Sequence, residues 1–105
     1  MSKFKYTIPT KFGIVTRTSA RTYTHVVLVG KMKESVFNSR GYDRPYSDYP
    51  NWMLVGYAGR PDLARKLSNP DTWNSSVGCR LKDFEEIVVV EITDDMKREI
   101  GKKAV

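Results

Sequence analysis

The sequence predicts an α+β protein: a mostly antiparallel sheet of four to five strands with two short helices packed on one face. Three observations support this class. Apolar and polar residues alternate at 3–8, two uninterrupted apolar runs lie at 26–29 and 87–90, and helix-start signals precede two short segments near 61 and 93. The 105 residues suit a single compact domain, 1–105.

The first predicted strand covers residues 4–8, where every second residue is apolar. A period of two is typical of a strand with one buried face. The polar face of this strand is basic, because it carries Lys3 and Lys5. A turn near Thr10 then leads into a second predicted strand, residues 12–17.

Two arrangements are open after the second strand. In the first, residues 18–20 form a hairpin turn into the next strand, so that Arg17 and Arg21 stand on the two sides of one turn. In the second, one long bent strand continues, and Arg17, Arg21, Tyr23 and His25 share a face because their spacing is even. Both arrangements gather the same side chains.

Residues 38–51 are predicted to form a long loop after a short helical turn at 32–37, because turn-forming Gly, Pro, Asn, Asp and Ser are frequent there. Such a loop is more often functional or mobile than decorative in a small domain. Tyrosines interleaved with arginines could stack on nucleobases and neutralise phosphates. Alternatively, the tyrosines fold the loop back onto the sheet. The residues concerned are Arg40, Tyr42, Arg44, Tyr46 and Tyr49.

The next predicted strand spans residues 52–57 and leads into a helix at 61–67. Pro61 suits the first helical position, and Leu63 and Leu67 are predicted to face the sheet together. Residues 71–81 are predicted to form another loop.

The run at 87–90 is apolar on both faces and is therefore predicted to lie in the middle of a covered sheet. A last helix is predicted from its cap at Thr93 to Gly101, with Met96 and Ile100 one turn apart.

The charge of the chain is uneven. The formal net charge is +6, yet residues 1–40 hold eight basic residues and one acidic residue, a net charge of +7. This asymmetry favours a negatively charged partner. No apolar stretch approaches the roughly 20 residues of a membrane helix, and the start has no secretory signal, so we expect no membrane association and a cytoplasmic location. A single cysteine, Cys79, predicts neither a disulfide nor a metal site, and no cofactor is expected.

The segment 17–25 is the strongest candidate for function, because arginines, hydroxyls, a phenol and the only histidine precede a buried strand. Guanidiniums bind phosphate oxygens in pairs, and hydroxyls and imidazole can fill the remaining contacts. The predicted ligand-binding residues are Arg17, Thr18, Ser19, Arg21, Tyr23 and His25, together with Arg40, Tyr42 and Arg44 of the loop.

The sequence predicts no catalytic residue. His25 enters an apolar strand, where histidine is more often a hydrogen-bonded structural residue. The pairs Glu85-Glu86 and Asp94-Asp95 are adjacent in sequence and do not resemble the spaced acid and base of a hydrolase.

Residues 16–25 (Thr-Arg-Thr-Ser-Ala-Arg-Thr-Tyr-Thr-His), together with Trp52 and residues 59–64 (Gly-Arg-Pro-Asp-Leu-Ala), resemble small uncharacterised proteins of bacteriophages and other mobile elements. That group has no assigned activity, so the resemblance transfers no catalytic residues. It implies a protein that binds and blocks or sequesters a component of the host, in the host cytoplasm.

Three hypotheses follow. The first is a non-enzymatic binder of a phosphate-bearing ligand, either nucleic acid or a nucleotide messenger. The second is an inhibitor that binds a host protein through the loop at 38–51, which is rich in the tyrosine and arginine typical of interface hot spots. The third is a small RNA-cleaving enzyme using Arg, Tyr and His, which is the least favoured. A homo-oligomer is compatible with each.

Overall fold

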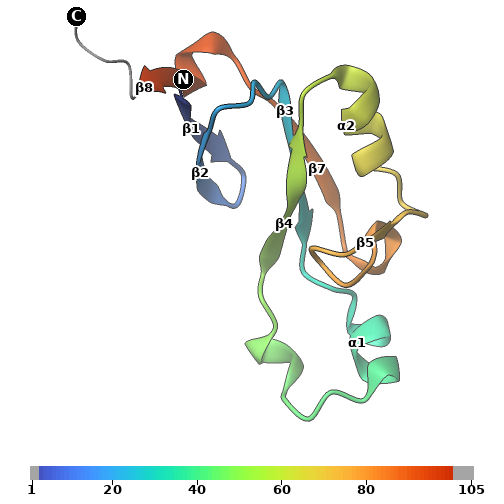
Figure 1. Ribbon diagram of the computed structural model, residues 1–105. Coiled ribbons are helices and arrows are strands. Elements are labelled where there is room, and N and C mark those ends of the chain that lie inside the picture. Colours follow the sequence, from blue (N-terminus) through green and yellow to red (C-terminus); the bar gives the residue numbers. More distant parts are fainter. Residues whose placement is uncertain (1–2, 101–105) are drawn as a thin grey trace, which may run out of the picture.

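The computed structural model describes residues 3–100, which form two antiparallel three-stranded sheets, a two-stranded hairpin and two short helices (Figure 1). The first sheet has the order β2-β1-β8, and the second has the order β4-β3-β7. The predicted α+β class is confirmed, but eight strands are present in this part of the chain rather than four to five. The strands are β1 (Lys3–Thr10), β2 (Gly13–Ser19), β3 (His25–Gly30), β4 (Trp52–Ala58), β5 (Trp73–Asn74), β6 (Cys79–Arg80), β7 (Ile87–Glu91) and β8 (Lys97–Ile100). The helices are α1 (Glu34–Arg40) and α2 (Pro61–Leu67), with 3-10 turns η1 (Tyr46–Asp48), η2 (Leu81–Asp83) and η3 (Asp94–Met96).

Strand β3 is the centre of the molecule, because apolar side chains cover both of its faces. Val26 and Leu28 pack against the first sheet, while Val27 and Val29 pack on the opposite side. The run at 87–90 is instead an edge strand, so its predicted central position is wrong. Within the described residues β7 pairs only with β3, and Val89 is 45% exposed.

The first sheet packs on one face of the second. Tyr6, Ile8 and Val15 are buried against the side of β3 that carries Val26 and Leu28. This apolar contact stabilises the packing of two sheets that share no strand pairing.

Helix α2 and the β5–β6 hairpin cover the other face of the second sheet, where Leu67 packs on the buried cluster. Helix α1 lies beyond the end of this sheet (Figure 1), and its buried Phe37 extends the same cluster. Pro61 opens α2 as predicted. Leu63, however, is 38% exposed and does not share the half-buried position of Leu67.

The helix predicted from Thr93 to Ile100 is wrong. One turn of 3-10 helix, η3, ends at Met96, and the chain continues as β8. This strand pairs with β1, where Lys97 lies opposite Tyr6. This pairing satisfies backbone groups of residues 3–6 on the second edge of β1. Local helix signals in the sequence carry no information about such a distant pairing. Gly101, the predicted end of the helix, lies outside the described residues.

Neither predicted arrangement of the segment after β2 is correct, because β2 and β3 belong to different sheets. Residues 20–24 cross from one sheet to the other. The hydroxyl of fully buried Tyr6 fixes this crossover: it donates to the carbonyl of Arg21 (2.8 Å) and accepts from the backbone N–H of Tyr23 (3.0 Å). The N–H of Arg21 donates to the Ser19 hydroxyl (3.1 Å). The backbone groups of Arg21 and the N–H of Tyr23 are therefore satisfied by side chains.

The segment predicted as the loop 38–51 is partly helical and packed. Helix α1 extends to Arg40, Gly41 ends it with φ 67°, and η1 follows. The rings of Tyr42, Tyr46 and Tyr49 surround Phe37 at centroid distances of 4.9, 5.3 and 5.9 Å. These contacts agree with the alternative in which the tyrosines fold the segment back onto the sheet, because Phe37 and Tyr49 belong to the apolar cluster of the second sheet.

Replacing Tyr6 by Phe should lower the free energy of unfolding by about 1–3 kcal/mol, because the Arg21 carbonyl and the Tyr23 N–H both lose their partner. Urea unfolding followed by circular dichroism measures the loss. Tyr57→Phe is the matched control: its hydroxyl is buried without a partner in the described part of the chain, so its removal should cause no loss. Equal stability of Tyr6→Phe and the wild type would contradict the role of the Tyr6 hydroxyl in fixing the crossover.

Candidate anion-binding surface

The solvent side of the first sheet is basic and rich in hydroxyls. Because Tyr6, Ile8 and Val15 point inward, the alternate positions of β1 and β2 point to solvent, as does Arg98 of β8. No carboxylate stands at these outward positions in the described strands. The polar outward residues, termed here the basic face, are Lys3, Lys5, Thr7, Thr16, Thr18 and Arg98.

At the centre of the basic face, two cations stand side by side. Lys5 lies directly opposite Arg98 of β8 and, on its other side, opposite Thr18 of β2. Like charges in this position repel, and neither cation forms an ion pair with any of residues 3–100. A bound anion would relieve the repulsion.

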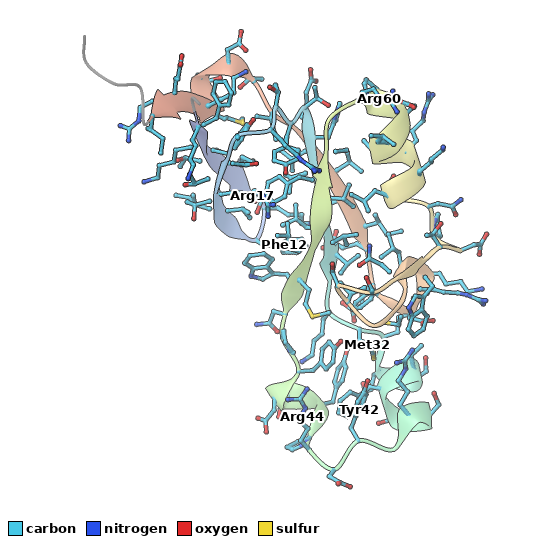
Figure 2. The ribbon with its side chains drawn as sticks, in the orientation of Figure 1. Phe12, Arg17, Met32, Tyr42, Arg44 and Arg60 are labelled. Atoms are coloured by element: carbon cyan, nitrogen blue, oxygen red, sulfur yellow. The ribbon has the colours of Figure 1, made fainter. Side chains whose placement is uncertain are left out.

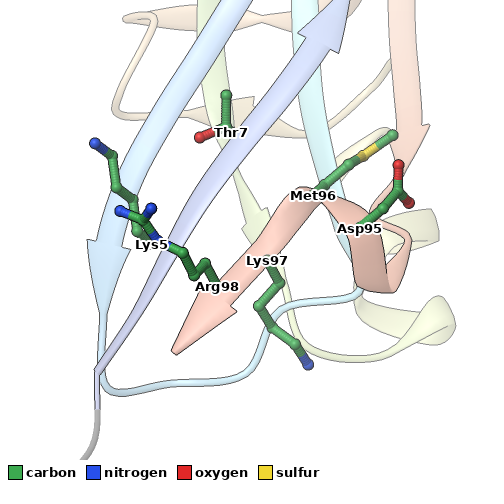
Figure 3. A pocket seen from close by; sticks show the side chains of 6 residues that line it. All are labelled: Lys5, Thr7, Asp95, Met96, Lys97 and Arg98. Atoms are coloured by element: carbon green, nitrogen blue, oxygen red, sulfur yellow. The ribbon is translucent and has the colours of Figure 1, made fainter. Parts of the chain in front are cut away.

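A pocket of about 270 Å³ adjoins this pair (Figure 3). Thr7 and Asp95 are among its lining residues. Figure 3 shows the Asp95 carboxylate at the far side from Lys5 and Arg98, where it accepts a hydrogen bond from the Thr93 hydroxyl. The cationic side of the pocket is therefore open to an added anion.

Four predicted residues converge at the crossover beside β2. The Arg17 guanidinium lies 5.5 Å from the ring centre of Tyr23 and 5.0 Å from that of Tyr57. The Ser19 hydroxyl donates to the Tyr23 hydroxyl (3.5 Å). This hydrogen bond, followed by the charges of Arg17 and Arg21, lowers the pKa of Tyr23, whereas burial raises the pKa of Tyr57. Arg17, Ser19, Arg21 and Tyr23 thus form an electropositive group, termed here the corner. Arg17 packs there on aromatic rings at the edge of the first sheet.

His25 does not join this corner. It begins β3, and the alternation along that strand places it on the side of Val27 and Val29, away from Tyr23. Its Nδ1 shares a hydrogen bond of 2.8 Å with the Thr24 hydroxyl. The predicted common face of Arg17, Tyr23 and His25 is therefore wrong.

Tyr42 and Arg44 lie at the opposite end of the molecule from Arg17 (Figure 2), and Arg40 ends α1, which lies at that same end (Figure 1). Arg40 pairs with Asp83 at 3.4 Å, and the Arg44 guanidinium lies 5.9 Å from the ring centre of Tyr49. The structure does not bring these residues to the segment 17–25. One small ligand cannot contact both groups.

The basic face contains residues that the sequence analysis did not select: Lys3, Lys5, Thr7, Thr16 and Arg98. The signal for the first two was present, because the polar side of the strand at 4–8 is basic. Arg98 could not be found in the same way, since its segment was predicted to be helical.

Comparison of the chain with protein-family models, with curated proteins and with solved structures found no match. The resemblance to bacteriophage proteins therefore stays a prediction. Within residues 3–100, no group of three or more His, Cys, Asp and Glu side chains is placed to hold a metal ion. No helix in the described part of the chain is long and apolar enough to cross a membrane.

Replacing Ser19 by Ala should raise the pKa of Tyr23, because the phenolate loses its main hydrogen-bond donor, and Arg17→Gln should raise it further by removing a cation. Since the fold lowers this pKa, ionisation of Tyr23 adds stability as the pH rises toward the unfolded value of about 10. NMR titration of the labelled phenol ring carbons measures both effects. Arg44→Gln, at the other end of the molecule, should leave Tyr23 unchanged; a Tyr23 pKa insensitive to both corner variants would contradict this geometry.

Proposed function

We propose that the protein is a non-enzymatic nucleic-acid-binding protein that acts in the cytoplasm by holding its ligand through the basic face. One observation carries the proposal: Lys5 and Arg98 stand opposite each other on neighbouring strands without an acidic partner in residues 3–100. A phosphate that bridges the two replaces repulsion by two charge-assisted contacts.

The chemistry of the basic face suits a phosphodiester backbone. Arginine gives paired donors to phosphate oxygens and lysine gives a point charge, while the hydroxyls of Thr7, Thr16 and Thr18 supply neutral hydrogen bonds. Within a sheet, neighbouring strands are about 4.8 Å apart and outward residues recur every ~6.7 Å along a strand. Cations spread over this grid fit an extended polyanion better than a single small ion.

The outward positions carry no aromatic side chain in the described strands, so the basic face offers no stacking platform for bases. Contacts to phosphate and sugar position a ligand without reading its sequence. We therefore infer binding that depends weakly on base sequence and strongly on salt.

The charge of the N-terminal region supports the same proposal. The first acidic residue of the chain is Glu34, so seven basic residues precede any carboxylate in the sequence. Such a field attracts polyanions over distances of about a Debye length. The basic residues are Lys3, Lys5, Lys11, Arg17, Arg21, Lys31 and Lys33. In the folded protein Lys11 is paired with Glu86 at 2.6 Å and Lys33 lies just before α1, so these two add little to the field at the basic face.

Of the alternatives, the protein-binding inhibitor has one observation in its favour. Tyr42 is 40% exposed although it packs on Phe37, and it lies between exposed Arg40 and Arg44. Tyrosine and arginine are frequent anchors at interfaces. The RNA-cleaving enzyme has less support, because His25 and Arg17 lie on different sides of the central sheet.

Lys5→Gln and Arg98→Gln should each weaken binding of a fluorescein-labelled oligonucleotide about tenfold, the loss expected for one hydrogen bond to a charged group. Each should also reduce the slope of log affinity against log salt by about 0.7–0.9. Fluorescence anisotropy over a range of salt concentrations measures both, and electrophoresis should recover the oligonucleotide intact.

Lys33→Gln is the matched control, because it removes the same charge from an exposed position just before α1, outside the basic face. It should change affinity little. A result in which Lys33→Gln weakens binding as much as the two basic-face variants would show that only net charge matters and would overturn the assignment of the site.

A further inference from the structure

A second surface, remote in sequence from β1 and β8, has the shape of a ligand site. A groove of about 420 Å³ lies between α2, β4 and the segment that enters β5. Its lining includes two exposed apolar side chains from its two sides, Leu63 of α2 (38% exposed) and Trp73 of β5 (60% exposed). Leu67 also lines the groove, packed so closely on Gly56 that a Cβ there would lie 3.2 Å from its Cδ2. The absence of a side chain at position 56 therefore keeps Leu67 low in the groove.

The wall that carries Trp73 is held in place without a ligand. Trp73 pairs with Arg80 across the β5–β6 hairpin. The side-chain oxygen of Asn74 accepts hydrogen bonds from the backbone N–H groups of Ser76 (2.9 Å) and Val77 (3.3 Å), which fixes the turn of this hairpin. An exposed indole on a fixed support is a preformed stacking surface, so binding costs little ordering of the wall.

The charge of the groove lining is positive and favours an anion. Lys66 is the charged residue of the lining, and the described residues place no carboxylate there. Lys66 forms no ion pair within residues 3–100. Thr72 and Asn74 add neutral hydrogen-bonding groups beside Trp73.

We propose that this groove binds a nucleotide, with the base stacked on Trp73 and a phosphate at Lys66. Aromatic side chains stack on any base, and the groove volume falls in the range of about 300–1,000 Å³ that small-molecule sites occupy. The same chemistry is present in a free nucleotide and in an unpaired nucleotide of a nucleic-acid strand. This groove shares no lining residue with the basic face, so its function does not rest on that surface.

Isothermal titration calorimetry with AMP, adenosine and ribose 5-phosphate tests the site. AMP should bind more tightly than either fragment, because the fragments lack the phosphate or the base. Trp73→Ala should weaken AMP binding by at least about fivefold, the lower end for loss of one base stack. Lys66→Gln should weaken AMP but leave adenosine unchanged, whereas Arg65→Gln, on the same helix but outside the groove, should leave AMP unchanged.

Two single-stranded oligonucleotides, one with bases and one abasic, distinguish the sources of the ligand. If Trp73→Ala weakens AMP binding, the ligand is a free nucleotide. If Trp73→Ala weakens binding of the base-containing oligonucleotide alone, the ligand is an unpaired nucleotide of a nucleic acid. If Trp73→Ala affects neither, the proposal is overturned. The double variant Lys5→Gln/Arg98→Gln should retain the Trp73-dependent binding, so failure of the basic face and failure of the groove can be told apart.

Discussion

The hydroxyl of Tyr6 connects the two halves of the molecule. It holds the carbonyl of Arg21 and the N–H of Tyr23, and so it joins the middle strand of the first sheet to the segment that leads into β3. The side chain can reach that segment only if Tyr6 points inward, and side chains alternate along a strand. Lys5 and Thr7 must then point to solvent. A slip of one residue in β1 would bury the cations and expose Tyr6 and Ile8, at the cost of the apolar contact between the sheets. The basic face is thus a consequence of the packing behind it.

The fold separates its candidate surfaces. The protein is elongated, with principal extents of 58 × 28 × 21 Å, and β3 runs through the core with apolar contacts on both faces. The first sheet, which carries the basic face, lies at one end, and α1, which carries Phe37, lies at the other (Figure 1). The groove at Trp73 is lined by residues of α2, β4 and β5. Because no residue is shared between the basic-face pocket and the groove, we expect variants in one to leave the other intact. The two sites together would give one polyanion two kinds of contact, to phosphate at the sheet and to a base at the groove.

Local signals in the sequence predicted local structure well. The alternation at 4–8, the apolar run at 26–29 and Pro61 correspond to β1, β3 and the start of α2. The errors concern pairing between distant segments. The apolar run at 87–90 proved neither that both edges of the strand are paired nor that both faces are covered: within the described residues β7 pairs only with β3, and Val89 is 45% exposed. The signals after Thr93 supported one helical turn, and the free edge of β1 determined what followed.

The same distinction holds for the candidate site. The convergence of Arg17, Ser19 and Tyr23 was predictable, because these residues are close in sequence. The opposite placement of His25 depends on the crossover, and the inclusion of Arg98 depends on a pairing across the whole chain.

The most direct test of the basic face as the binding site is an amide NMR titration of the ¹⁵N-labelled protein with a short oligonucleotide. The account predicts chemical-shift changes concentrated on β1, β2 and β8, centred on Lys5, Thr18 and Arg98. Changes centred instead on the segment 40–49, with the first sheet unaffected, would contradict it.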